Sequence, residues 1–436
     1  MILPDEFVRQ MHDLLPYEEL ERFVQSITQE DAPTSIRLNP AKPIDPPTGS
    51  EPVTWCSDGY YLSERPSFTL DPLFHAGCYY VQEASSMYLA EILKIINNKV
   101  DLAGKTVLDL CAAPGGKSTL LLSHLPEDTL VVCNEVVRNR AQILRENIIK
   151  WGHPNAVVTS NEARDFQPLG ALFDLILCDA PCSGEGMFRK DPQSIQQWSA
   201  ANVNLCQRRQ RDILTDIWPC LRTDGLLAYS TCTYNKKENE ENVEWLCQTL
   251  GAELLHSRRF MPHLSRGEGL FIALLRKISP TPSPVIRQKK RQTPAPIPSH
   301  LATWFQAPAH YVITASADGS FYAFAQSFAP VIEHLRQHLY TLHFGIQLAT
   351  LKGKDKLQPS HSLAMSKFLN RSKFTTVEIT LETALSYLRT EAITLPSTTP
   401  RGYTLLTYQG HPLGFVNNLG SRANNLYPSE WRIRKQ

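Results

Sequence analysis

Residues 106–119 read TVLDLCAAPGGKST, an apolar run that opens into a glycine-containing loop and then a helix-like stretch. Gly115 and Gly116 carry no Cβ, so a ligand can approach the backbone closely. Backbone N–H groups at a helix start favour negative or polar ligand groups. The glycine spacing is neither GxGxxG nor GxxxxGK[ST], which supports neither a dinucleotide fingerprint nor a P-loop. Taken alone, the loop is either a nucleotide-like cofactor site or a tight strand–helix turn.

Apolar runs and helical patterns alternate on the C-terminal side of this loop. The expected strands are 129–135, 156–160, 173–181, 225–233 and 269–277, and the expected helices are Asn139–Trp151, Asn202–Leu221 and Asn239–Leu250. Such alternation indicates an α/β fold with a mostly parallel sheet covered on both faces. Ligands bind at the carboxyl ends of the strands of such sheets.

The flanking regions divide the chain further. Residues 1–100 read as an N-terminal α/β extension, with a helix over Asp5–Phe23 and another over Glu83–Ile96, and residues 101–278 form the α/β domain. The stretch 279–300, rich in proline and basic residues, reads as an extended linker. Residues 301–436 read as a β-rich region of one or two modules, with hairpins at 311–324 and 405–416.

Charge is distributed unevenly along the chain. Residues 285–436 hold 17 Lys and Arg against 7 Asp and Glu, whereas residues 1–284 hold 27 against 36. A basic C-terminal third on an acidic body suggests contact with a polyanion such as RNA, and a basic surface on a stable domain is the alternative.

The cysteines exclude two classes of protein. All ten lie between Cys56 and Cys247, with no CxxC pair. This spacing fits neither a zinc site nor a small disulfide scaffold, so we expect reduced thiols and no metal. Most should be buried apolar side chains.

Three more segments follow expected strands. Glu135 ends the second strand, about where an acidic side chain accepts hydrogen bonds from ribose hydroxyls. CDAPCSGEGMFRKDP (178–192) contains Asp179 and Cys182, and YSTCTYNKKENEENVEW (229–245) contains Cys232. Both cysteines should face the same sheet edge, which is unusual for cysteines that only pack.

Together these segments resemble the Sun-type (Fmu) RNA cytosine-5 methyltransferases. LDLCAAPGGKST, NE, DAPCSGEGMFRKDP, STCTY and GLFIALLR occur in the family's order, preceded by SIRLNP (35–40) and GCYYVQEASSM (77–87). The tail segments 352–366 and 409–434 resemble the PUA-like region of the RsmF type, which methylates 16S ribosomal RNA of the small subunit. The resemblance implies a Rossmann-like class I methyltransferase domain followed by a β-rich PUA-like module.

The resemblance also implies roles for individual residues. Cys232 would be the nucleophile, Cys182 would assist release of the methylated RNA, and Asp179 would hold the cytosine. The expected S-adenosyl-L-methionine contacts are Cys111, Ala112, Ala113, Pro114, Gly115, Gly116, Lys117, Glu135, Arg140, Glu162 and Asp179. Family members usually have Asp at the adenine contact, where this chain has Glu162, with Asp165 three residues on.

A thiol suits this chemistry because carbon 5 of cytosine is a poor nucleophile. A thiolate added to carbon 6 makes carbon 5 an enamine carbon that can accept a methyl group, and a carboxyl group at N3 stabilises the adduct. A base must then remove the carbon-5 proton so that the thiol can leave.

Contacts to the RNA are expected from several basic residues. Arg37, Arg189 and Lys190 are candidate phosphate contacts, with solvated surface charge as the alternative. The run Lys289, Lys290 and Arg291 would act electrostatically, without regard to sequence.

Three other functions share some of these features: the same chemistry on transfer RNA, a non-catalytic RNA-binding assembly factor, and a small-molecule methyltransferase. The two edge thiols argue against the second, and the basic tail argues against the third. No signal peptide or membrane span is recognisable, so we expect a cytoplasmic protein, acting as a monomer on 16S ribosomal RNA or the small ribosomal subunit.

Overall fold

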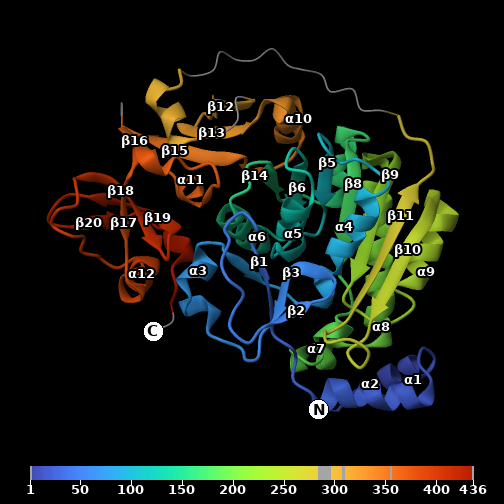
Figure 1. Cartoon of the computed structure of the whole chain (residues 1–436). Helices are drawn as coiled ribbons and strands as arrows, with labels where there is room; N and C mark the ends of the chain where they lie inside the picture. The colour runs from blue at the N-terminus through green and yellow to red at the C-terminus, as the bar shows by residue number, and fades with distance from the viewer. Residues whose placement is uncertain (1, 283–295, 307–309, 354–355, 435–436) are drawn as a thin grey trace.

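An eight-stranded sheet forms the centre of the computed structural model, which describes residues 2–282, 296–306, 310–353 and 356–434 (Figure 1). Its strand order is β10-β11-β9-β8-β5-β6-β7-β14. The strands are β5 (Thr106–Asp109), β6 (Leu130–Asn134), β7 (Ala156–Thr159), β8 (Phe173–Asp179), β9 (Leu221–Thr231), β10 (Ala252–Phe260), β11 (Leu270–Lys277) and β14 (Thr341–Phe344). The five from β5 to β9 pair in parallel, whereas β10, β11 and β14 pair antiparallel.

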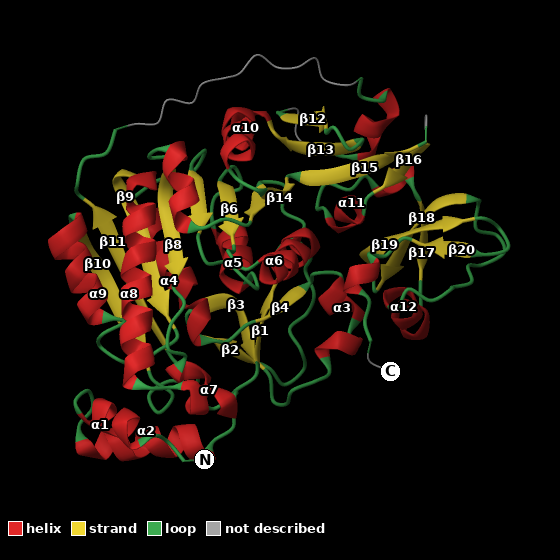
Figure 2. Ribbon diagram, turned by 180° about the vertical axis from the view of Figure 1, so that it is seen from behind, coloured by secondary structure: helices red, strands yellow, loops and turns green. Residues whose placement is uncertain are grey.

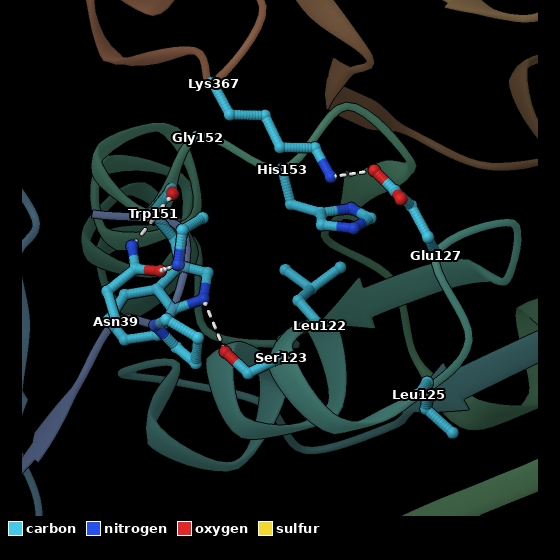
Figure 3. A pocket seen from close by; sticks show the side chains of 11 residues that line it. Asn39, Leu122, Ser123, Leu125, Glu127, Trp151, Gly152, His153 and Lys367 are labelled. Carbon is cyan, nitrogen blue, oxygen red and sulfur yellow. Dashed lines mark hydrogen bonds and ion pairs between the residues drawn. The ribbon is translucent and has the colours of Figure 1, made fainter. Parts of the chain in front are cut away.

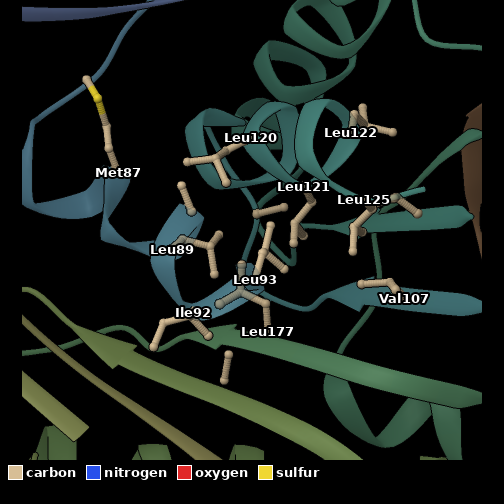
Figure 4. Packing of buried hydrophobic residues seen from close by; sticks show 14 of the residues in the cluster. Met87, Leu89, Ile92, Leu93, Val107, Leu120, Leu121, Leu122, Leu125 and Leu177 are labelled. Atoms are coloured by element: carbon tan, nitrogen blue, oxygen red, sulfur yellow. The ribbon is translucent and has the colours of Figure 1, made fainter. Parts of the chain in front are cut away.

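Helices cover both faces of this sheet (Figure 2). The side chains of β5 alternate between two cores: Val107 faces α4 (Leu89–Asn97) and α5 (Gly116–His124), and Leu108 lies in the opposite core with α8 (Ala200–Ile217). Figure 4 shows leucines of α4 and α5 packed over Val107 and Leu177. Because both faces are covered, every residue of β5 and β6 is buried, and their apolar residues stand in uninterrupted runs, 107–108 and 130–133, instead of alternating with polar residues. The predicted fold class is confirmed.

The N-terminal extension differs from the expected single helix over Asp5–Phe23. Two helices form instead, α1 (Asp5–His12) and α2 (Tyr17–Gln29). Pro16 lies between them, and a proline both lacks an N–H donor and disfavours helical backbone in the residue before it. The segment expected as a helix over Glu83–Ile96 starts with a 3-10 turn, and α4 begins only at Leu89.

A four-stranded sheet completes the N-terminal extension. Its order is β2-β3-β1-β4, and the strands are β1 (Ser35–Leu38), β2 (Glu51–Val53), β3 (Cys56–Tyr61) and β4 (Tyr79–Val81). The short α3 (Pro72–His75) precedes β4.

The C-terminal third holds two further four-stranded sheets. The first has the order β12-β13-β15-β16, with β12 (Tyr311–Ala315), β13 (Ser320–Ala325), β15 (Ile346–Lys352) and β16 (Lys356–Pro359). The second has the order β17-β18-β19-β20, with β17 (Thr375–Glu378), β18 (Gly402–Tyr408), β19 (His411–Asn418) and β20 (Ala423–Asn425). The hairpins expected at 311–324 and 405–416 are confirmed as β12–β13 and β18–β19.

One strand of this third belongs to the central sheet. β14 pairs antiparallel with β7, placing Phe344 opposite Val157, and Phe344 is 5% exposed. The helix α10 (Ala329–His338) before it covers the same face as α8. The sheet expected from residues 101–278 alone therefore includes one edge strand, β14, from the C-terminal third of the chain.

The remaining helices are α6 (Arg138–Trp151), α7 (Pro192–Gln197), α9 (Glu240–Trp245), α11 (His361–Met365) and α12 (Leu381–Leu388). Over the described ranges of the chain, no helix is long and apolar enough to cross a bilayer. The basic run at Lys289, Lys290 and Arg291 lies outside the described residues.

Candidate active site

The carboxyl ends of four parallel strands bring the predicted residues together. Asp109 ends β5, Glu135 follows β6, Asp179 ends β8 and Cys232 follows β9. Asp179 and Cys232 lie close together because Asp179 pairs with Ser230 in the register of β8 and β9. Residues far apart in the sequence thus share one edge of the sheet, as expected for a parallel arrangement.

The two loop cysteines meet at this edge. The Sγ atoms of Cys182 and Cys232 are 3.1 Å apart, both thiols are free, and both residues are partly exposed. Gly186 permits this approach of the two loops: its N–H donates to the carbonyl of Cys232 at 2.8 Å, and a Cβ there would lie 2.7 Å from that oxygen. Any larger residue at position 186 would push the loops apart.

The Cys182 thiol has a strongly raised pKa. Its hydrogen bond with the Cys232 thiol is the main cause, followed by burial and by the charges of Cys232 and Glu238. At neutral pH Cys182 therefore carries its proton, which makes it a poor nucleophile.

Asp179 is held by two donors. Lys117 Nζ lies 2.7 Å from its Oδ2, and Ser230 Oγ donates to its Oδ1 at 2.7 Å. Burial opposes the charge of Lys117, but Asp179 more than compensates, so the pKa of Lys117 is raised. Lys117 was expected to contact the cofactor; here its ammonium is bonded to Asp179.

The glycine loop is fixed from the side by α6. Gly115 adopts φ +116°, a left-handed conformation that favours glycine. Arg140 donates to the carbonyl of Ala113 and Asn147 to that of Pro114, both at 2.8 Å. Arg140 also lies 3.6 Å from the Glu135 carboxylate. The side chains of α6 thus hold the loop through its carbonyl groups.

The residues present fit an S-adenosylmethionine site. Asp109 is fully buried, and its Oδ1 has no hydrogen-bond partner among the described residues, although Ser118 donates to Oδ2 at 2.6 Å. Burial raises the pKa of Asp109 to about 7. An unpartnered carboxyl oxygen next to Glu135 and the glycine loop gives this edge acceptors for the ammonium and ribose hydroxyls of such a cofactor.

Glu162, the residue expected to contact adenine, lies in a helix cap. Glu162 and Asp165 form a reciprocal capping box at the start of a 3-10 helix, in which the Asp165 carboxylate accepts from the Glu162 N–H at 2.9 Å. The Glu162 side chain is 54% exposed and pairs with Arg164. Asn161, beside them, exchanges two hydrogen bonds with the backbone of Tyr340, directly before β14.

Two of the three expected phosphate contacts are wrong. Arg37 is fully buried: it donates to Gln82 at 2.8 Å and Thr119 at 2.6 Å, and burial lowers its pKa to about 10. Arg189 is 6% exposed and pairs with Glu268 at 3.0 Å. Lys190 is 31% exposed and remains a candidate.

Three parts of the chain meet at a cavity of about 200 Å³, which lies away from the two cysteine loops (Figure 3). Asn39 comes from the extension, Trp151 and Ser123 from the central domain, and Lys367 from the C-terminal third. Lys367 pairs with Glu127, and the Trp151 indole donates to Ser123 at 3.1 Å. The cavity marks the junction between these parts and holds none of the predicted site residues.

Sequence reasoning missed two buried acidic residues of the thiol loops. Glu185 and Glu238 are both fully buried and bonded to the opposite loop. Their signal was present: each lies within six residues of an edge cysteine, in a polar loop. Nothing in the sequence distinguished them from surface acids.

Comparisons with known proteins agree with this architecture. Three family models match the chain: "16S rRNA methyltransferase RsmB/F" over residues 100–276, the N-terminal domain of "16S rRNA methyltransferase RsmF" over 3–84, and "Methyltransferase RsmF PUA domain" over 374–433. Ribosomal RNA small subunit methyltransferase F of Salmonella arizonae is 31% identical and that of Escherichia coli O157:H7 is 30% identical, each over 98% of this chain and 96% of the relative.

Solved structures share the fold. A methyltransferase homologue from Pyrococcus horikoshii is 27% identical over 63% of this chain and all of its own, with a TM-score of 0.52. NSun6 from the same organism covers 63% of this chain and 98% of its own, with 21% identity and a TM-score of 0.55. The chain belongs to the RsmB/F family, and it is an S-adenosylmethionine-dependent RNA methyltransferase.

Proposed function

We propose that the chain methylates carbon 5 of a cytosine in 16S ribosomal RNA through a covalent adduct with Cys232. The observation that carries the proposal is the pair of thiols, 3.1 Å apart and beside Asp179 at the edge where the cofactor is expected. A methyltransferase acting on an already nucleophilic atom has no need of two thiols there.

Each residue has a task in this reaction. The Cys232 thiolate adds to carbon 6 of the cytosine, and the electron pair moves to carbon 5. The bound cofactor supplies a methyl group on a sulfonium, which carbon 5 takes up. N3 takes up a proton from solvent as the thiolate adds and returns it to solvent on release. Asp179, oriented by Lys117 and Ser230, accepts a hydrogen bond from this N3–H of the adduct.

Release completes the cycle. A base removes the proton from carbon 5, the double bond returns between carbons 5 and 6, and the Cys232 sulfur leaves as a thiolate. Cys182 assists this step, as the resemblance implies.

The target base must leave its stack to reach the thiols, so a loop or a partly assembled subunit suits the enzyme better than a regular duplex. The names of the full-length relatives support 16S ribosomal RNA as the substrate. The match of residues 374–433 to a PUA domain and the basic tail support RNA contact by the C-terminal third. Action as a monomer in the cytoplasm stays a prediction.

The test is transfer of labelled methyl groups from S-adenosylmethionine to naked 16S ribosomal RNA, intact 30S subunits and transfer RNA in parallel. Bisulfite sequencing then maps the base. One protected cytosine in a ribosomal substrate is the expected result. Labelling of transfer RNA alone would replace the substrate, and labelling at another base or atom would overturn the chemistry. Without labelling of any RNA, the assembly-factor alternative would gain support.

A further inference from the structure

Two buried carboxylates connect the loops that carry Cys182 and Cys232, because each belongs to one loop and accepts hydrogen bonds from the other. Glu185, on the Cys182 loop, accepts hydrogen bonds from the backbone N–H groups of Tyr234 at 2.7 Å and Asn235 at 3.0 Å, on the Cys232 loop. Glu238, on the Cys232 loop, accepts from the N–H of Ser183 at 3.1 Å, next to Cys182. The exchange is reciprocal, so each loop fixes the backbone of the other.

The partners of Glu238 are all donors. Besides Ser183, its carboxylate accepts from Gln210 Nε2 at 2.7 Å and Asn235 Nδ2 at 2.8 Å. Burial raises the pKa of Glu238, but a protonated carboxyl would need an acceptor that these three partners do not provide. The hydrogen bonds therefore favour the ionised form, and a negative charge lies beside the Cys182 loop.

The charged groups near the two thiols differ in kind and in distance along the loops. Lys117, from α5, faces Cys232, whose charge is among those that raise the pKa of Lys117, and Asp179 is bonded to Lys117. Glu238 acts on Cys182. Two phenols also lie near the thiols, Tyr229 beside Cys182 and Tyr234 beside Cys232. Burial raises both pKa values well above 10, so both are neutral. The Glu185 carboxylate lies on the Cys232 side, but it is bonded to the N–H groups two and three residues after Cys232. Glu238 is bonded to the N–H of Ser183, the residue directly after Cys182.

We propose that Glu238 is a positioning residue that keeps the shared proton on Cys182 and leaves Cys232 as the thiolate. The Cys182 S–H donates to the Cys232 sulfur across 3.1 Å, and the negative carboxylate beside Cys182 disfavours a second negative charge there. Two chemically identical groups thus acquire different roles. The inference rests on the proposed function for its consequence in catalysis, but the position of the proton can be measured without RNA.

The test is alkylation of the full-length protein by iodoacetamide between pH 6 and 10, with the rate at each cysteine read by mass spectrometry. In the wild type we expect Cys232 to react first. In E238Q an amide N–H replaces one acceptor oxygen and the charge is lost, so the ratio of Cys182 to Cys232 labelling at pH 7 should rise about tenfold, the ratio for one pKa unit. The control is E244Q, since Glu244 is an exposed residue of α9 bonded only to Gln248 in the described structure.

Further variants separate a charge effect from a folding effect. E238D keeps the charge and should retain the wild-type order of labelling. If E238Q does not fold, the pH dependence of Cys232 in C182S is compared with that of Cys182 in C232S; Cys232 should react at the lower pH. Equal or reversed reactivities, or an unchanged ratio in folded E238Q, would overturn the proposal. Failure of methyl transfer with the expected labelling would instead count against the proposed function alone.

Discussion

The sheet edge that carries the candidate site differs from the two borders of the central domain, here called the N-terminal and C-terminal seams, in how far apart the contacting residues lie along the chain. At the edge, Asp109, Asp179 and Cys232 each stand in a short segment whose spacing is visible in the sequence. At the N-terminal seam, Arg37 of β1 contacts Thr119 of α5; at the C-terminal seam, β14 pairs with β7. The candidate site residues can therefore be recognised from short segments of sequence, whereas the contacts that hold the central domain in place join segments far apart in the chain.

Loss of the edge nucleophile should have the largest effect. Cys232→Ala should lower methyl transfer at least about 10³-fold, because no other group supplies the bond to carbon 6. Affinity for S-adenosylhomocysteine, measured by calorimetry, should stay near that of the wild type. Cys206→Ala on α8 is the control, and turnover by Cys232→Ala at the wild-type rate would contradict the mechanism.

The C-terminal seam should matter for stability and cofactor binding together. Phe344→Ala removes a buried ring of β14 and should lower the free energy of unfolding by about 3–5 kcal/mol. Chemical denaturation gives that value, and calorimetry gives the cofactor affinity, which should fall because Tyr340 and Asn161 lose their anchor. The control is Leu419→Ala, which truncates a partly exposed apolar side chain in the same third of the chain. If Phe344→Ala weakened RNA binding alone, the seam would have no part in the cofactor site.

Substitution of Arg37 distinguishes a buried structural role of this residue from a contact to RNA phosphate. Arg37→Met should lower the free energy of unfolding by about 2–3 kcal/mol, because Gln82 and Thr119 lose a charged donor. A phosphate contact would instead leave stability unchanged and reduce the salt dependence of RNA binding by about one unit. Denaturation and RNA binding at several salt concentrations distinguish these outcomes.

The smallest effect concerns His124 of α5, whose Nε2 lies 3.0 Å from Asp58 of β3. Burial opposes its charge, but Asp58 and Cys56 together outweigh burial and raise the pKa of His124 from 6.5 to about 9. Because the folded pKa is raised, this contribution to stability is complete below pH 6.5 and is lost as the pH rises through about 9.

Melting temperatures measured from pH 6 to pH 10 check this. The wild type should lose stability over that interval by a few degrees more than His124→Gln. Parallel curves for the two proteins would show that the pair contributes nothing to the N-terminal seam.

Features set by a local pattern could be predicted from the sequence, and features set by long-range contacts could not. The strands at 129–135 and 173–181 were recognisable because buried parallel strands contain uninterrupted apolar runs, here residues 130–133 and 175–178. Cys182 and Cys232 were recognisable because they follow such strands. Pro16 was present in the sequence, yet the helical period of the neighbouring residues concealed the break between α1 and α2. β14 could not be assigned, because four residues carry too little pattern to specify a partner strand. The burial of Arg37 depends on Trp151 and Thr119, which no local pattern connects to it.

The pairing of β14 with β7 also has a consequence for biosynthesis. A ribosome adds roughly 5–20 residues per second, and β14 ends 185 residues after β7, at Phe344 against Thr159. For roughly 10–40 seconds, by the same rate, the nascent chain therefore exposes an apolar strand edge that only its own later segment covers. Such an edge can pair with other chains, so translation arrested within that interval should yield an aggregation-prone product, and release after residue 344 should not.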